Sequence, residues 1–132
     1  MSQENVELVW QSSLAWSDGG EDALLQYLDA DVEWLPPRDS MNVGIYRGHD
    51  GVVRATKRWI EAYEWLLIEL EQIVGAGDRV VSIHRWRAKA RYTGIEFDTP
   101  LAYVWTFRDG KIIHYRAFSD PKQALEAAGL RE

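Results

Sequence analysis

The N-terminal quarter of the chain carries the hydrophobic spacing of helices. After a capping Ser2, apolar side chains recur every three or four positions as far as Trp16, which predicts an amphipathic helix. The pair Gly19-Gly20 is expected to end this helix, and residues 21–28 are expected to form a second, shorter one. Two helices are therefore predicted before the first strand.

A short strand and a third helix are predicted next. Val32–Leu35 is expected to be a strand that two prolines end, and residues 38–47 are expected to form a loop. Gly48 opens a helix, because apolar residues continue from Val52 to Leu66 at helical spacing.

The remainder of the chain has the composition and spacing of β-strands. Strands are expected over residues 67–74, 79–92, 95–107 and 111–119. Asp120-Pro121 is typical of the start of a last helix, which Gly129 closes. Helices followed by a meander of antiparallel strands predict an α+β fold. The length of 132 residues fits a single domain covering residues 1–132.

Charge pairing suggests a register for the central hairpin. If Thr93-Gly94 is a two-residue turn, Lys89 lies opposite Asp98 and Arg91 lies opposite Glu96. Both faces of the resulting sheet are apolar near its middle, so both are expected to be covered, one by helices and one by a second copy of the chain. One face carries Val81, Ile83, Arg85, Arg87, Ala102, Val104 and Thr106, and the other carries Val80, His84, Trp86, Leu101, Tyr103, Trp105 and Phe107.

Composition removes several function classes. The net charge of -6 is unsuited to a phosphate backbone, so no nucleic-acid partner is expected. The chain has no cysteine, which excludes disulfides and thiolate chemistry. Its apolar runs are too short to span a membrane and its N-terminus is polar and acidic, so we expect a cytoplasmic protein without a membrane partner. The 7 tryptophans supply rigid aromatic area for a core, a pocket or an interface.

Seven segments spread over the chain resemble the SnoaL-like group of the nuclear transport factor 2-like superfamily. They are Ser-x-Glu-Asn-Val-Glu-Leu-Val at 2–9, Asp-Ala-Leu-Leu at 22–25, Asp-Val-Glu-Trp at 31–34, Tyr-Arg-Gly-His-Asp-Gly-Val at 46–52, Ala-Gly-Asp-Arg-Val-Val at 76–81, Pro-Leu-Ala-Tyr-Val-Trp-Thr-Phe-Arg-Asp-Gly-Lys at 100–111 and Ala-Leu-Glu-Ala-Ala-Gly at 124–129. The resemblance implies a cone-shaped roll, in which a curved antiparallel sheet wraps around the N-terminal helices and leaves a deep apolar cavity.

The resemblance also implies which sheet face lines the cavity. It places the face that carries Val81 and Arg85 inside, with Tyr115 and Ala117 beside it. The face that carries Trp86 and Trp105 then lies outside, where it is expected to form a homodimer surface. Such dimers are common among proteins of this kind.

The catalytic sets of related enzymes are not intact at the matching positions. In a gapless comparison with the ketosteroid isomerases, the general base falls on Trp34, the tyrosine on Ser12 and the oxyanion-hole aspartate on Ala102. The aspartate of the cyclases and epoxide hydrolases falls on Ala117, and the hydrolase Arg-x-Asp pair keeps Arg85 but not its acid. A typical ketosteroid isomerase is therefore not expected.

Arg85 is the first of the expected ligand-binding residues. Inside an apolar cone its guanidinium needs a partner, either an acid such as Glu33 or an anionic group of the ligand. The alternative is a position at the rim, paired and solvated.

Four aromatic residues complete the expected ligand-binding set. Trp59 and Tyr63, one turn apart on the third helix, could stack on a flat ligand or simply pack in the core. Trp34 and Tyr115 leave the same choice.

The histidines and Asp120 are weaker candidates. His84 and His114 have outward phase and favour surface or interface roles, and His49 lies at a helix start. Asp120 is expected to cap the last helix. Three scattered histidines give no metal-site spacing, so no metal and no cofactor are expected.

Two functions remain open at this point. The first is binding of a small, largely apolar, cyclic molecule in an aromatic-lined cavity, with or without cofactor-independent isomerase, cyclase or hydrolase activity. The second is a non-catalytic ligand-binding or dimeric interaction module whose interior is filled by tryptophan side chains.

Overall fold

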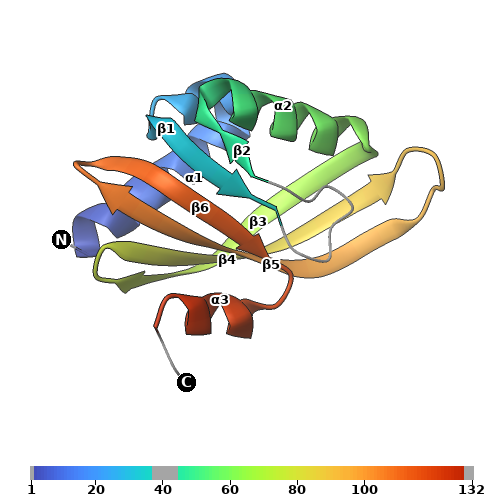
Figure 1. Ribbon diagram of the computed structural model, residues 1–132. Coiled ribbons are helices and arrows are strands. Elements are labelled where there is room, and N and C mark those ends of the chain that lie inside the picture. The colour runs from blue at the N-terminus through green and yellow to red at the C-terminus, as the bar shows by residue number, and fades with distance from the viewer. Residues whose placement is uncertain (1, 37–44, 130–132) are drawn as a thin grey trace.

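The computed structural model describes residues 2–36 and 45–129, and in them three helices and six strands. The predicted α+β class and single curved roll are confirmed (Figure 1). In chain order the elements are α1 (Ser2–Leu25), β1 (Leu28–Leu35), β2 (Tyr46–Arg47), α2 (Gly48–Glu61), β3 (Tyr63–Ala76), β4 (Arg79–Ala90), β5 (Glu96–Arg108), β6 (Lys111–Phe118) and α3 (Pro121–Ala127).

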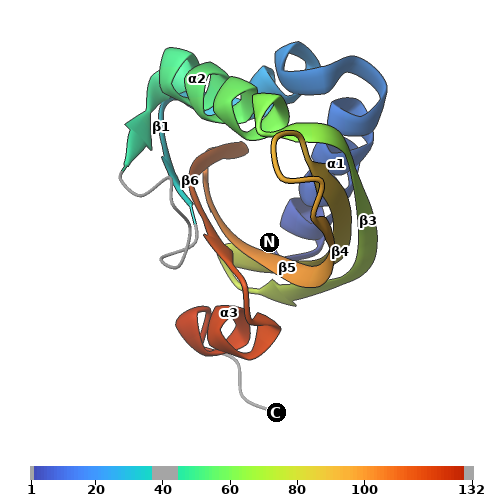
Figure 2. The same ribbon diagram turned by 90° about the vertical axis from the view of Figure 1, so that its right-hand side faces the viewer.

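The six strands form one sheet in the order β2-β1-β6-β5-β4-β3. The strands from β3 to β6 are antiparallel neighbours, whereas β1 runs parallel to β6, so the sheet is mixed rather than wholly antiparallel. Figure 2 shows that the sheet curves strongly, with α1 and α2 on its concave side and α3 on its convex side. No helix in the described part of the chain is long and apolar enough to cross a membrane.

Two helix boundaries differ from those expected. The backbone of α1 continues through Gly19-Gly20 to Leu25, so the two predicted N-terminal helices are one. The third helix ends at Glu61, and Leu66 lies in β3. Pairing of β3 with β4 along its whole length satisfies the backbone there, and this overrides the helical spacing of the side chains. Of the predicted loop over residues 38–47, residues 46–47 form β2, and 38–44 lie outside the described residues.

The central hairpin has a different register from the predicted one. Lys89 pairs with Glu96, which is two residues away from the expected pairing with Asp98. The loop is longer than a two-residue turn: the Ala90 N–H donates to the Ile95 carbonyl, and Gly94 adopts a φ of 72°. A slip of two residues leaves every side chain on its predicted face, because the side-chain period of a strand is also two.

The tip of this hairpin is joined to the end of α2. The Arg91 guanidinium donates hydrogen bonds to the backbone oxygens of Glu61, at 3.1 Å, and Tyr63, at 2.9 Å. The Arg91 N–H donates to the Ala62 carbonyl as well. Carbonyls at the end of a helix lack partners within it, and a cation is favourable there.

The concave face is the reverse of the expected one. The main core contains Val80 from β4 and Trp105 from β5, packed against Val9 of α1 and Val52 of α2. The prediction that the Trp86, Tyr103 and Trp105 face lies outside as a dimer surface is therefore wrong. The face that carries Val81 is convex and packs under α3. The convex cluster consists of Val81, Ala102, Val104, Phe118 and Ala124.

The N-terminal cap of α3 can be tested by substitution. The Asp120 side chain accepts a hydrogen bond from the Lys122 N–H, as predicted. Asp120→Ala removes this bond and is expected to lower the free energy of unfolding by about 1 kcal/mol in urea denaturation. Lys122→Ala keeps the backbone donor and serves as the matched control. An equal loss in both variants would contradict the capping role.

Candidate functional site

Four aromatic side chains form what we call the Tyr115 cluster on the concave face. Tyr115 of β6 stacks between Trp34 of β1, with ring centroids 4.6 Å apart, and Trp105 of β5, at 4.9 Å. Tyr103 lies beside both tryptophans, 5.7 Å from Trp34 and 5.3 Å from Trp105. The predicted candidates Trp34 and Tyr115 are thus brought together on the inner side of the sheet.

A second group, the Trp86 cluster, lies farther along the same face. Trp86 of β4 stacks on Phe97 of β5 with a centroid separation of 5.9 Å. Trp59 of α2 and Tyr63 of β3 pack against Trp86 at 5.7 and 5.2 Å. All four rings keep some exposure to solvent. The predicted candidates Trp59 and Tyr63 therefore also meet, although they come from a helix and a strand rather than from one helix.

Between the two clusters lies a small polar group. Ser82 and His84 are consecutive inward-facing residues of β4, and both are buried. The Trp105 indole N–H donates to Ser82 Oγ at 2.7 Å, and His84 Nε2 lies 2.8 Å from the same oxygen. The Tyr103 ring meets the imidazole edge-on at 5.3 Å. His84 Nδ1 is buried and has no hydrogen-bond partner among the side chains and backbone that the structure describes.

Burial controls the protonation of these groups. Loss of hydration lowers the pKa of His84 to about 4, so its imidazole is neutral near pH 7. Burial likewise raises the pKa of Tyr103 and of Tyr115. The pKa of Tyr63 is also raised by burial, and a hydrogen bond with Trp59 opposes part of that increase. His84 and the three tyrosines are therefore uncharged at neutral pH.

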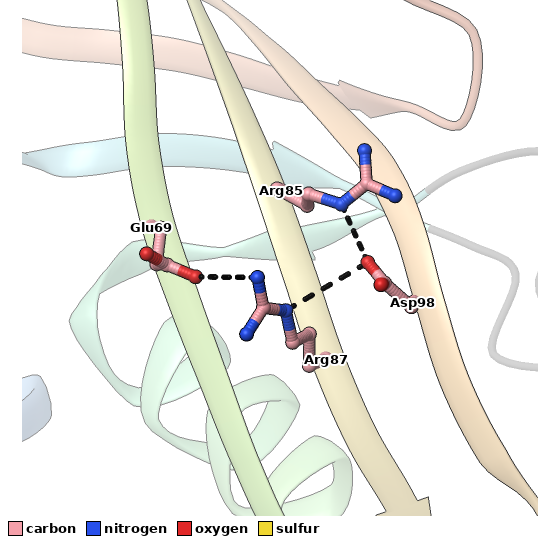
Figure 3. A network of polar contacts seen from close by, with 4 residues as sticks. All are labelled: Glu69, Arg85, Arg87 and Asp98. Atoms are coloured by element: carbon pink, nitrogen blue, oxygen red, sulfur yellow. Dashed lines mark hydrogen bonds and ion pairs between the residues drawn. The ribbon is translucent and has the colours of Figure 1, made fainter.

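Arg85 and Glu33 lie on the convex face, so neither is where it was expected. Figure 3 shows Arg85 paired with Asp98, which also lies 3.8 Å from Arg87. Arg87 in turn reaches Glu69 at 3.4 Å. The prediction of an inward Arg85 that meets Glu33 is wrong, and the alternative of a paired, solvated position holds: its side chain is 43% exposed. Glu33 pairs instead with Arg47 at 3.2 Å.

The positions compared with catalytic residues of ketosteroid isomerases, cyclases and epoxide hydrolases separate in space. Trp34 lies on the concave face, and Ala117 lies there too, opposite Tyr103. Ser12 is buried in α1, where its hydroxyl donates to the Val9 carbonyl at 2.9 Å. Ala102 lies on the convex face, so it does not occupy an interior oxyanion position.

The other two histidines, His49 and His114, make contacts that hold secondary-structure elements together or lie on the convex face. His49 Nε2 lies 3.0 Å from the Leu28 carbonyl, which ties the start of α2 to β1. His114 is paired with Glu33 across β6 and β1 on the convex face. Burial is the main cause that lowers the pKa of His114. Among residues 2–36 and 45–129, no three acidic or histidine side chains gather in a way that could hold a metal ion.

His84 faces inward, which corrects the outward phase expected for it, and Ser82 contacts it there as a further buried polar residue of the site. The sequence signal for an inward position is the alternation of charged and uncharged residues along β4. Along β4, Ser82 and His84 share parity with the apolar Val80 and Ala88, whereas every charged residue of the strand has the other parity.

The buried imidazole predicts a specific loss of stability in acid. The unfolded chain takes up a proton near pH 6.5, whereas His84 in the folded protein does so near pH 4. Its contribution is complete above pH 6.5 and is lost as the pH falls toward 4, by on the order of 3 kcal/mol. Urea denaturation between pH 7.5 and 4 measures this slope. His84→Phe is expected to flatten it and His114→Phe to retain most of it; equal slopes in wild type and His84→Phe would contradict a neutral buried imidazole.

Substitution of Arg85, unlike that of the buried His84, is expected to change stability little. Because its ion pair is exposed to solvent, Arg85→Met is expected to leave the free energy of unfolding close to that of the wild type. The core variant Val80→Ala supplies the comparison, with an expected loss of about 2 kcal/mol. Urea denaturation of both variants checks this. A loss for Arg85→Met as large as that for Val80→Ala would show that its side chain is not on the solvated face.

Comparison with known proteins supports the fold independently. The family model described as SnoaL-like domain matches residues 11–115. No curated protein matches the sequence.

Solved structures align over most of the chain. An NTF2-like protein from Burkholderia thailandensis E264 is 26% identical, covers 96% of this chain and 97% of its own, and gives a TM-score of 0.81. Bal32a from a soil-derived mobile gene cassette is 24% identical over 88% of both chains, with a TM-score of 0.78. TerC co-crystallized with polyporic acid is 22% identical over 96% of this chain and 98% of its own, also with a TM-score of 0.78. With its family match and its curved roll, the chain belongs to the SnoaL-like domain family.

Proposed function

We propose that this protein binds a small, uncharged, largely apolar cyclic molecule against the concave face of the sheet. The observation that carries the proposal is the arrangement of that face: two clusters of aromatic rings with one buried, incompletely hydrogen-bonded imidazole between them. Small-molecule sites have this composition, with aromatic walls and few polar groups that fix orientation. A structural neighbour, TerC, was co-crystallized with polyporic acid, which supports a small-molecule role.

The Trp86 cluster is the entrance in this proposal. Its rings come from the end of α2, the start of β3 and the β4–β5 hairpin, which extends beyond the helix (Figure 1). Phe97 is 37% exposed, whereas Trp105 of the Tyr115 cluster is 6% exposed. Aromatic side chains lose little rotameric freedom on binding and offer flat apolar surfaces. A partly exposed group of this kind favours a flat or cyclic ligand.

The charge distribution supports an uncharged ligand. The register of β4 with β5, together with the alternation of side chains along each strand, places the charged residues of both strands at convex-face positions. A charged ligand would have to be desolvated against aromatic rings without a counter-ion from these two strands, which is costly. These residues are Arg79, Arg85, Arg87, Lys89, Glu96, Asp98 and Arg108.

An enzymatic version of this function has one observation in its favour. His84 is the one titratable imidazole on the concave face of the described strands, and an isomerase, cyclase or hydrolase without a cofactor needs such an acid–base group. Two observations stand against it. Burial alone lowers the pKa of His84, with no carboxylate acting on it. Trp34 and Ala117 also stand at the positions compared with the acidic residues of related enzymes. Binding is therefore the primary proposal.

The expected homodimer and cytoplasmic location stay predictions. The residues expected at the dimer surface lie on the concave face, in or beside the proposed site, so the dimer that we propose uses the convex face of the sheet. That face exposes Trp65 and Leu67 beside its ion pairs.

A pair of tryptophan variants tests the binding site. Trp86 lies on the concave face and Trp65 on the convex face, where it pairs with Lys89. Tetralin, a bicyclic hydrocarbon, and its ketone 1-tetralone serve as probes in titrations followed by the indole N–H signals in NMR spectra. Trp86→Ala is expected to weaken their binding about tenfold, because an aromatic wall is lost. Trp65→Ala is expected to leave it unchanged.

Two results would contradict the proposal. One is a wild-type protein that binds neither probe up to the limit of its solubility. The other is an equal loss of affinity in Trp86→Ala and Trp65→Ala, which would place binding elsewhere than on the concave face.

A further inference from the structure

The polar group at the centre of the concave face has one atom without a partner. His84 is 4% exposed, and within the described part of the chain its Nδ1 has no hydrogen bond. A buried polar atom left unsatisfied is costly, so native proteins rarely retain one without a role. The other ring nitrogen is held by Ser82 at 2.8 Å, which fixes the plane of the imidazole.

The hydrogen-bond count decides which nitrogen carries the proton. An indole N–H can only donate, so Ser82 Oγ is an acceptor toward Trp105, at 2.7 Å. The fully buried Ser82 hydroxyl still needs an acceptor, and His84 Nε2 is the acceptor that it contacts. If Nε2 carried the proton instead, both the Ser82 hydroxyl and Nδ1 would lack partners. The arrangement with fewer unsatisfied groups has Nε2 bare and the proton on Nδ1.

The three side chains then form a directed chain of donors. The Trp105 N–H donates to Ser82, the Ser82 O–H donates to His84 Nε2, and the Nδ1–H is left as the free end. Each bond in such a chain polarises the next and strengthens it. The free end is therefore a good donor although the imidazole carries no charge.

We propose that His84 Nδ1–H donates a hydrogen bond to an uncharged acceptor oxygen of the ligand, a ketone or another carbonyl on an apolar ring system. This inference rests on the proposed function and adds the polar group by which the ligand is recognised. A carbonyl is preferred to a hydrocarbon because it supplies the missing acceptor. It is preferred to a carboxylate because β4 and β5 place no cation on this face.

The ligand must displace a side chain to reach this atom. Nδ1 is enclosed, and the neighbours of His84 on the same face include Tyr103, edge-on at 5.3 Å, and Trp86, two residues along β4. Both are only partly buried. In this proposal the ligand reaches the imidazole when one of these rings changes its rotamer.

A matched pair of probes tests the inference. Tetralin and 1-tetralone share one carbon skeleton, and only the ketone carries an acceptor oxygen. Wild-type protein is expected to bind 1-tetralone about tenfold more tightly, the effect of one good hydrogen bond in a buried place. His84→Phe is expected to abolish this difference and to leave tetralin affinity similar. His114→Phe, on the convex face, is expected to preserve the difference.

The possible results distinguish failure of the His84 hydrogen bond from failure of ligand binding on the concave face. Equal affinity of the wild type for both probes would overturn the inference and leave the proposed function standing. Binding of neither probe would overturn both. A difference that persists in His84→Phe would assign the acceptor contact to another residue and also overturn the inference.

A second measurement needs no variant and holds even if His84→Phe fails to fold. The nitrogen chemical shifts of the imidazole distinguish a protonated from a bare ring nitrogen in the wild-type protein. We expect a protonated Nδ1 and a bare Nε2 with and without 1-tetralone, and a lowered carbonyl stretching frequency of the bound ketone. A bare Nδ1, or an unshifted carbonyl band, would overturn the proposal.

Discussion

Guanidinium and carboxylate groups are too costly to bury without partners, and this constraint sets the direction in which the sheet curves. Along β4 and β5 the charged residues all have one parity, so one face of the hairpin must be solvated. Arg85, Arg87, Asp98 and Glu69 neutralise one another there (Figure 3). The opposite face of the hairpin carries apolar and aromatic side chains together with the uncharged Ser82, His84 and Thr99, and this is the face that the helices cover.

That same parity explains why part of the fold was predicted correctly and part was not. The α+β class and most strands follow from alternation and turns, which are local signals. The choice of the inner face was wrong because both faces are apolar at their centres, through Val81 and Val104 on one side and Val80 and Trp105 on the other. The convex apolar residues are covered by α3, a contact between segments far apart in the sequence. The charges of the hairpin were the better guide to its faces.

The candidate site was predictable only in part, for a related reason. The aromatic character of Trp34, Trp59, Tyr63 and Tyr115 left open whether they line a site or pack in the core. All four lie on the concave side, and Tyr115 belongs to the main core. Their grouping depends on strand order, since Tyr115 meets Trp34 through the parallel pairing of β1 with β6. The bond between Trp105 and Ser82 joins neighbouring strands 23 residues apart in the chain, and no motif in the sequence marks such a contact.

Three hydrogen bonds from Arg91 join the tip of the β4–β5 hairpin to the end of α2. Two of them run from its side chain and one from its backbone, and all three end on carbonyls at the α2–β3 junction. These are the same two elements that frame the Trp86 cluster. Widening of that frame by a swing of the hairpin would require all three bonds to break together, whereas turning one indole requires none of them to break. For the proposed ligand, an entry that keeps these three bonds intact has the timescale on which an aromatic ring reorients and not the timescale on which a lid opens.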